Sequence, residues 1–229
     1  MEQITSTANQ KIVEYAKIKI KKYRDKNGLF IIEGKNLISE CPKDLIVDKF
    51  STIREKGFTY ISDNVMKKLS SFKVPLTQLA VCRSEMDKKY GHKVLYLDNL
   101  QDPGNVGTLI RSAVAFGFDS VVVKGVDVHN SKVIQASQGS FFKINVWNVK
   151  EYPNNINKPI ICAVVDSESQ SYNKIYNFKE LVLVLGNEGQ GISKEMLDIA
   201  NHKAYIPIEF ESLNVSSAGA ILLNHFKSN

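Results

Sequence analysis

The chain has 229 residues, of which 43% are hydrophobic and 24% are charged, and these values indicate an ordinary globular protein of one large or two small domains. No run of 18 apolar residues occurs, so the sequence predicts no membrane-spanning helix, and the first nine residues lack the apolar core of a secretory signal. The cysteines (Cys41, Cys82 and Cys162) form no CxxC pair, which predicts free thiols in a cytoplasmic protein. The four histidines are scattered as well, and we expect no metal site.

The net charge of +6 is unevenly divided along the chain. Residues 1–93 carry 19 Lys and Arg against 11 Asp and Glu, whereas residues 94–229 carry 11 against 13. The basic side chains are densest in one predicted helix and the turn after it, at Lys11, Lys17, Lys19, Lys21, Lys22, Arg24 and Lys26. This asymmetry indicates a domain that holds a polyanion, with Lys17, Lys21, Lys22 and Arg24 as the candidate contacts. A merely solvated lysine surface is the alternative.

The basic helix opens a predicted α/β/α domain over residues 1–88. The residues expected on the core-facing side of this helix are Ile12, Tyr15, Ala16 and Lys19 or Ile20. The elements predicted after it are a turn at 27–28, a strand at 29–33, a helix at 34–40, strands near 44–48, 59–61 and 79–82, and helices near 52–56 and 64–71. Residues 84–93 are charged and lack a periodic apolar face, so they are the predicted linker to a second domain over residues 89–229.

The second domain is predicted to alternate strands and helices. The predicted strands are 94–97, 120–123, 142–147, 160–165, 181–185 and 204–208, and the predicted helices are 106–116, 131–138 and 215–226. Alternating units of this kind indicate an α/β layer fold with a mostly parallel sheet. Pro207 falls inside the last predicted strand, and proline cannot donate a hydrogen bond to a neighbouring strand. This strand is therefore expected at the edge of the sheet, or the strand is expected to end at the proline.

Three strand-to-helix junctions of this domain carry polar or glycine-rich loops, at residues 94–111, 181–193 and 204–223. Because parallel strands end at the same edge of a sheet, we expect these loops to converge, and open α/β folds bind ligands at such an edge. The third junction holds four small hydrogen-bonding side chains, at Ser212, Asn214, Ser216 and Ser217. Capping a helix needs only one such residue. The pattern therefore favours a ligand site over capping alone.

The second loop, residues 186–191 (GNEGQG), follows a buried strand as phosphate-binding loops do. Its spacing matches neither GxGxxG nor GxxxxGK[ST], so a dinucleotide site is disfavoured. Glu188 would repel a pyrophosphate and suits a cationic ligand. Arg111 lies among the apolar residues Leu109 and Ile110, which suggests a desolvated anion as its partner, whereas most arginines on helices are surface cations.

The three junctions resemble the three ordered motifs of the SpoU-type (TrmH-like) RNA 2′-O-ribose methyltransferases, which belong to the SPOUT (α/β-knot) superfamily. The matching stretches are residues 102–111 (DPGNVGTLIR), 185–193 (LGNEGQGIS) and 206–219 (IPIEFESLNVSSAG), and residues 136–140 (ASQGS) also fit. The first domain is similar, less specifically, to the ribosomal-protein-like substrate-binding domain of the rRNA-modifying members. The family layout therefore covers both domains.

The resemblance implies a deep trefoil knot in the C-terminal domain, a homodimer, and bound S-adenosylmethionine. The positions that match the family's cofactor pocket are Leu185, Gly186, Ile206 and Leu213. The positions that match its active site are Asn105, Arg111, Glu188, Ser212 and Asn214. The chain departs from the family between residues 206–208 and 211–214, where only Glu209 and Phe210 intervene, about two residues fewer than usual.

The chemistry of the motifs agrees with methyl transfer to a ribose hydroxyl, which is a weak nucleophile that needs alignment and loss of its proton. The family scheme assigns that activation to Arg111, but an arginine side chain is a poor general base. We therefore expect Arg111 to orient the ribose and to stabilise the developing alkoxide. The expected substrate is large-subunit rRNA, with tRNA second. The rival classes are a non-catalytic RNA-binding or ribosome-assembly protein and a nucleotide-binding Rossmann enzyme.

Overall fold

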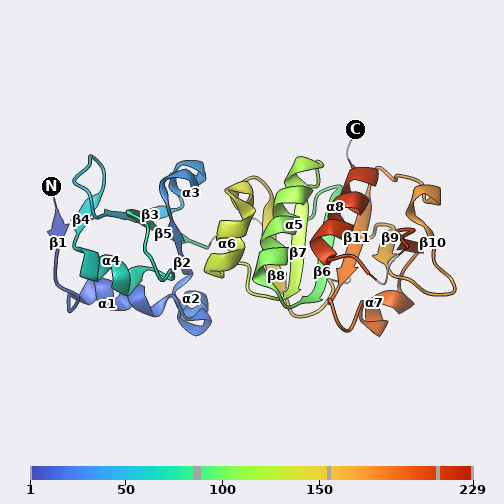
Figure 1. The fold of residues 1–229 in the computed structure, drawn as a ribbon, viewed down its shortest axis with the longest axis horizontal. Helices are drawn as coiled ribbons and strands as arrows, with labels where there is room; N and C mark the ends of the chain where they lie inside the picture. Colours follow the sequence, from blue (N-terminus) through green and yellow to red (C-terminus); the bar gives the residue numbers. More distant parts are fainter. Residues whose placement is uncertain (1, 85–88, 154–155, 210–211, 228–229) are drawn as a thin grey trace. The chain divides into compact units, whose positions relative to one another are not determined.

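The computed structural model describes residues 2–84, 89–153, 156–209 and 212–227. The chain forms two compact units, one of Met1–Glu85 with His129–Phe142 and the other of Met86–Val128 with Lys143–Asn229. Each unit has its own sheet (Figure 1). Residues 129–142, which we expected in the second domain, cluster with the first unit. Within the predicted linker, residues 85–88 lie outside the described part of the chain.

The first unit contains a five-stranded mixed sheet in the order β1-β4-β3-β5-β2. Its strands are β1 (Gln3–Ile4), β2 (Leu29–Glu33), β3 (Ile46–Ser51), β4 (Thr59–Ile61) and β5 (Gln78–Arg83). Its helices are α1 (Gln10–Lys17), α2 (Lys21–Asn27), α3 (Lys35–Glu40), α4 (Asp63–Leu69) and α6 (Ser131–Ser137), followed by the short 3-10 helix η1 (Ser140–Phe142). Helices α1 and α4 pack together, with Ile12 and Val65 in one apolar cluster with Phe50 of the sheet.

The basic stretch predicted as one helix is two helices, because α1 ends at Lys17 and α2 begins at Lys21. The break changes which side chain reaches the core: Ile18 is 2% exposed, whereas Ile20 is 58% exposed. The helix predicted near 52–56 is wrong, since these residues form bends and a turn. There the Ser51 hydroxyl accepts a hydrogen bond from the Ile53 N–H, a local contact that competes with helix formation.

The second unit contains a seven-stranded sheet in the order β10-β12-β9-β11-β6-β7-β8, and every pair of neighbours is parallel. Its strands are β6 (Lys93–Leu100), β7 (Ser120–Gly125), β8 (Asn145–Val149), β9 (Ile160–Ala163), β10 (Gln170–Ser171), β11 (Leu181–Gly186) and β12 (His202–Tyr205). Its helices are α5 (Pro103–Ala115), α7 (Lys194–Asp198) and α8 (Val215–His225), with the 3-10 helix η2 (Tyr172–Lys174). The α/β fold with a mostly parallel sheet is thus confirmed.

Two element ends differ from the predictions in ways that matter for the loops. Helix α5 begins at Pro103, three residues early, because Asp102 Oδ1 accepts the Gly104 N–H and proline suits the first helical position. Asn105 consequently lies in the first turn of a helix. Strand β12 ends at Tyr205, before Pro207, so the proline follows the strand and interrupts no ladder.

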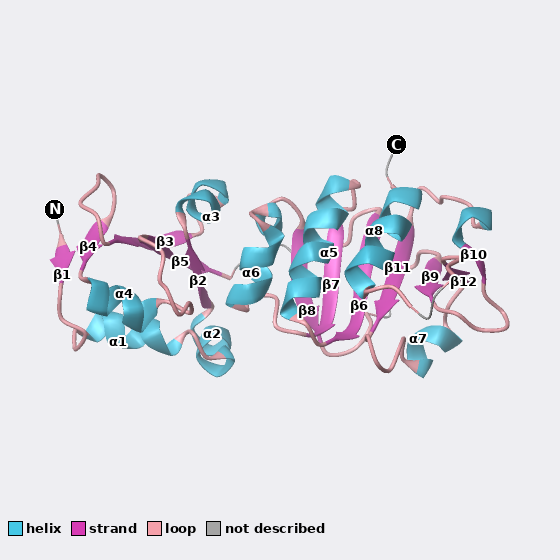
Figure 2. Ribbon diagram, viewed as in Figure 1, coloured by secondary structure: helices cyan, strands magenta, loops and turns pink. Residues whose placement is uncertain are grey.

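Helices α5 and α8 lie side by side on the sheet of the second unit (Figure 2), and they pack directly on each other. Gly219 of α8 is buried at this contact. A Cβ atom there would overlap the Leu109 side chain of α5 and would lie 2.8 Å from Leu185 Cδ1 of β11. The absence of a side chain therefore lets α8 settle between α5 and β11.

A buried lysine fastens the carboxyl end of α8. Lys93 is 4% exposed. Its Nζ donates hydrogen bonds to the carbonyl oxygens of Phe226 (2.6 Å) and Lys227 (2.8 Å) and to Asn177 Oδ1 (2.9 Å). Burial lowers the pKa of Lys93 from its usual value. None of the helices in the described residues is long and apolar enough to cross a membrane.

We predict that Gly219→Val lowers the free energy of unfolding by about 1–3 kcal/mol, because the added atoms overpack a close helix contact. Chemical denaturation of the purified protein measures this change. Asn224→Ala on the exposed side of α8 is the control, and it should not destabilise the protein. An unchanged denaturation midpoint for Gly219→Val would contradict the close packing of α8 on α5 and β11.

Candidate active site

The candidate site lies at the carboxyl ends of the parallel strands in the second unit. Strands β6 and β11 are direct neighbours, and Gly186 pairs in register with Asp98. The loops that follow these two strands therefore leave the sheet side by side. Strand β12 is separated from β11 by β9, so the third junction begins two strands away. The predicted convergence of the loops holds most closely for the first two.

Two of the predicted active-site residues are joined by a hydrogen bond. Asn105 Nδ2, in the first turn of α5, donates to Glu188 Oε1 in the loop after β11, at 2.9 Å. Asn105 is half-buried and Glu188 is exposed, so the carboxylate remains open to solvent and to a ligand. Its second oxygen provides an acceptor for a polar substrate group.

The loop that carries Glu188 is held in shape by its own backbone. Asn187 and Gly191 exchange N–H···O hydrogen bonds of 2.9 Å in both directions. The Asn187 side-chain oxygen also accepts the N–H groups of Gly189 (2.8 Å) and Gln190 (2.9 Å). A Cβ atom on Gly186 would overlap the backbone of Gly191 and the residue after it, so the loop can close only over glycine. The sequence reasoning missed Asn187, although an asparagine between glycines after a buried strand is a turn signal.

Two further residues at the end of β6 were missed. Asp98 is fully buried; its Oδ2 accepts the Ser193 N–H at 2.8 Å, and its Oδ1 lies 3.7 Å from Lys124 Nζ. Asn99 has a φ of 58°, and its carbonyl oxygen accepts the Asn187 Nδ2–H at 2.8 Å. The polar Asp-Asn pair at the end of an apolar strand was the available signal in the sequence.

The third junction combines capping with an open cavity. Asn214 caps α8, since its Oδ1 accepts hydrogen bonds from the Ser216 N–H (2.8 Å) and the Ser216 hydroxyl (2.6 Å). Capping therefore explains Asn214 and Ser216, whereas Ser212 and Ser217 are exposed and lie outside this cap. Of the shortened stretch in the third motif, Glu209 is exposed, and residues 210 and 211 lie outside the described residues.

A cavity of about 220 Å³ lies between the segments that follow β9 and β12 and the start of α8. Its lining residues are Ala163, Val164, Val165, Ala204, Tyr205, Ile206, Ile208, Ser212, Leu213, Ala218 and Leu222. None of these described lining residues is charged, so the cavity suits an apolar ring with few polar groups better than a pyrophosphate. Ile206 and Leu213 of the predicted cofactor set line it. Leu185 lies nearby, against Gly219.

Arg111 lies on the outer side of α5. The side chains before it, Leu109 and Ile110, are fully buried, whereas Arg111 is exposed, so the expected apolar surroundings are not present in this chain. Among the described residues, no hydrogen bond or ion pair joins Arg111 to the Asn105–Glu188 pair. Its guanidinium thus faces solvent.

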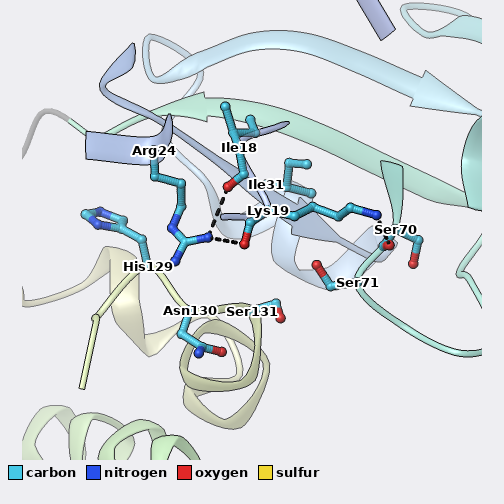
Figure 3. Close-up of a pocket in the computed structure, with 9 residues that line it drawn as sticks. All are labelled: Ile18, Lys19, Arg24, Ile31, Ser70, Ser71, His129, Asn130 and Ser131. Carbon is cyan, nitrogen blue, oxygen red and sulfur yellow. Dashed lines mark hydrogen bonds between the residues drawn. The ribbon is translucent and has the colours of Figure 1, made fainter. Parts of the chain in front are cut away.

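Three of the four predicted RNA-contacting residues have partners within the first unit. Lys17 pairs with Glu14 and Lys21 with Asp25, both at 2.7 Å on the exposed surface. The hydrogen bond to Glu14 raises the pKa of Lys17. Figure 3 shows Arg24 turned back on the end of α1, where its NH1 donates to the carbonyl oxygens of Ile18 (3.0 Å) and Lys19 (2.6 Å) beside a polar pocket of about 360 Å³. Lys22 is exposed.

The model of the SpoU rRNA Methylase family matches residues 92–224. The chain is 32% identical to the 23S rRNA (guanosine(2553)-2′-O)-methyltransferase RlmP of Bacillus subtilis, over 99% of this chain and 100% of that protein. A crystal structure of an RNA 2′-O ribose methyltransferase is 26% identical with a TM-score of 0.79, over 97% of each chain. An AdoMet-bound rRNA methyltransferase from Sinorhizobium meliloti, 24% identical, has the same fold, with a TM-score of 0.84 over 98% of this chain and 96% of that chain.

The chain therefore belongs to the SpoU rRNA methylase family. Both the family match and the full-length similarity to RlmP confirm the resemblance derived from the three motifs. The protein is an RNA 2′-O-ribose methyltransferase.

Proposed function

We infer that the protein methylates a ribose 2′-hydroxyl of large-subunit ribosomal RNA. The observation that carries this inference is the similarity to RlmP over the full length of both chains, which includes the first unit as well as the motif-bearing unit. The uncharged cavity beside the motif loops supports the same chemistry, because it disfavours the dinucleotide of a Rossmann enzyme.

The proposed cofactor site comprises the cavity at the start of α8 and the end of β11. Ile206 and Leu213 offer apolar surface there, and Leu185 and Gly186 form the end of the neighbouring strand. When bound, S-adenosylmethionine supplies a methyl group on a positively charged sulfur. The exposed Glu188 carboxylate provides a negative charge at the adjacent loop, and it would attract such a cation.

The proposed active-site roles follow from the hydrogen-bonding groups present. In the reaction an oxygen–carbon bond would form and the carbon–sulfur bond would break, which would leave S-adenosylhomocysteine as a neutral thioether, and the proton of the ribose hydroxyl would pass to solvent water. Asn105, Ser212 and Asn214 would position the ribose, the neighbouring phosphate and Arg111 by hydrogen bonds, and Glu188 would hold Asn105. A guanidinium is a poor proton acceptor, so Arg111 would stabilise the developing alkoxide rather than accept the proton.

The same proposal covers the architecture that the family implies. It includes a substrate-binding domain over residues 1–88 and a catalytic domain over residues 89–229 whose carboxyl-terminal segment is knotted. After β12, which lies on the far side of β9 from β11, the chain crosses back over the sheet, and α8 packs on α5 and β11. This crossing supports the proposed knot. We place the enzyme in the cytoplasm, and the free state of Cys41, Cys82 and Cys162 supports this location.

The first prediction from this function concerns Arg111. Arg111→Lys should lower the single-turnover rate of methylation by at least about a hundredfold, because lysine cannot reproduce a planar, forked donor at the reacting oxygen. Radiolabelled methyl transfer to ribosomal RNA, followed by mapping of 2′-O-methyl sites, measures the rate and tests the function itself. Calorimetry should show nearly unchanged S-adenosylmethionine binding.

Arg83→Lys, an exposed arginine of the first unit, is the matched control and should methylate at the wild-type rate. If Arg111→Lys is as active as Arg83→Lys with saturating RNA, then Arg111 is not catalytic. The mechanism would in that case depend on Glu188 and Asn214.

A second prediction concerns the proposed RNA contacts on α1 and α2. Changing Lys17, Lys21 and Lys22 together to Glu should weaken RNA binding and reduce its salt dependence, because fewer counterions are released. Filter binding over a salt series measures both effects, and cofactor affinity should not change. The control is the same triple change at three exposed lysines of the second unit, Lys150, Lys174 and Lys179. Equal RNA affinity of the first triple variant and the wild type would refute the assignment.

A third prediction concerns assembly. A two-fold dimer is proposed on the family resemblance, and the exposed apolar side chains of Leu213 (39%) and Ile221 (37%) near α8 provide surface for it. Light scattering at micromolar concentration should give twice the chain mass of 25.7 kDa. A strictly monomeric enzyme with full activity would contradict the proposal.

A further inference from the structure

The Glu188 loop comprises residues 187–193, between β11 and α7. Both of its ends form hydrogen bonds to consecutive residues of β6, Asp98 and Asn99. At the start of the loop, Asn187 Nδ2 donates to the Asn99 carbonyl oxygen at 2.8 Å. At its end, the Ser193 N–H donates to Asp98 Oδ2 at 2.8 Å. We call Asp98, Asn99 and Asn187 the loop clamp. The clamp ties the loop after β11 to the end of β6, which also leads into α5 and Asn105.

The residues of the clamp carry features that cost folding free energy unless other contacts compensate for them. Asp98 is fully buried, and a buried carboxylate is costly unless hydrogen bonds or a cation compensate it. Asn99 adopts a left-handed φ of 58°, which non-glycine residues rarely do. Asn187 is 8% exposed, so its amide is withdrawn from water and depends on its protein partners. Strain and buried polarity of this kind are typical of functional sites.

The clamp fixes the backbone on both sides of Glu188. Asn187 precedes it directly, and the Asn187 side-chain oxygen accepts the N–H groups of the two residues after it, Gly189 and Gln190. One buried carboxamide therefore sets the direction in which the Glu188 side chain leaves the loop. That direction brings the Glu188 carboxylate to Asn105 Nδ2 at 2.9 Å.

We propose that Asn187 is a positioning residue for methyl transfer, which acts by holding Glu188 against Asn105 and is supported by Asp98. This proposal rests on the proposed methyltransferase function. Because Asn187 has little exposed surface, it acts through Glu188 rather than through contact with RNA or cofactor.

A double-mutant cycle tests this proposal. Asn187→Ala should lower the single-turnover rate by about thirtyfold with saturating RNA and S-adenosylmethionine, since small misplacement of a reacting group is costly. In a Glu188→Ala background the same change should lower the rate by less than about threefold, because the residue that it positions is already absent. The Michaelis constant for S-adenosylmethionine should change little in Asn187→Ala.

Asn148 provides a matched control in the same unit. Its side chain makes three comparable hydrogen bonds, from the Val128 N–H (3.0 Å) and to the carbonyl oxygens of Val123 (3.1 Å) and Val126 (2.7 Å). Asn148→Ala removes a similar, half-buried network near the end of another strand. Any effect of Asn148→Ala on the rate should be the same with and without Glu188, and thermal melting should show a comparable loss of stability for both asparagine variants.

The possible results are distinct. If Asn187→Ala lowers the rate by the same factor in both backgrounds, Asn187 is merely structural and the proposal is overturned. If Asn187→Ala does not fold, Asn187→Asp keeps an oxygen for the Gly189 and Gln190 N–H groups and loses the donor to the Asn99 carbonyl, and it must show the same dependence on Glu188. If the wild-type protein fails to methylate ribosomal RNA, the proposed function itself is wrong.

Discussion

The pairing of β6 with β11 is the constraint on which the site depends. The two strands run parallel in register over six pairs, from Leu181 opposite Lys93 to Gly186 opposite Asp98. The pairing ends where β11 ends, at Gly186 opposite Asp98, while β6 continues to Leu100, so that Asp98 and Asn99 stand beside the start of the Glu188 loop. A slip of one residue would turn every buried side chain of the strand toward the opposite face. The buried apolar residues on both strands therefore fix the polar groups beyond them.

Close packing at two glycines places the third junction relative to β6 and β11. Gly186 lets the loop after β11 fold back on Gly191, and Gly219 lets α8 pack against Leu109 of α5. The start of α8, with the Asn214 cap, consequently lies at the cavity lined by Ile206 and Leu213. Two positions without side chains thus bring the three motif-bearing segments into one packed arrangement.

The sequence predicted those features that depend on periodicity and on local turn chemistry. The buried run of β11, the alternation of strands and helices, and the three polar junctions could all be read from spacing. The clamp could not, because Asp98, Asn99 and Asn187 are defined by contacts between residues 88 and 95 positions apart. The break between α1 and α2 was also missed, since each helix alone continues a plausible basic pattern. Contact between distant segments likewise groups residues 129–142 with the first unit.

The buried ammonium of Lys93 has a consequence for how this protein is made. Lys93 begins the first strand of the second unit, yet its partners include the Phe226 carbonyl, 133 positions later. Contacts so far apart in sequence slow folding, because a long loop must close before they form. During synthesis, β6 emerges from the ribosome long before the segment that satisfies its first residue. The unit cannot complete its hydrogen bonding until almost all of the chain has been translated.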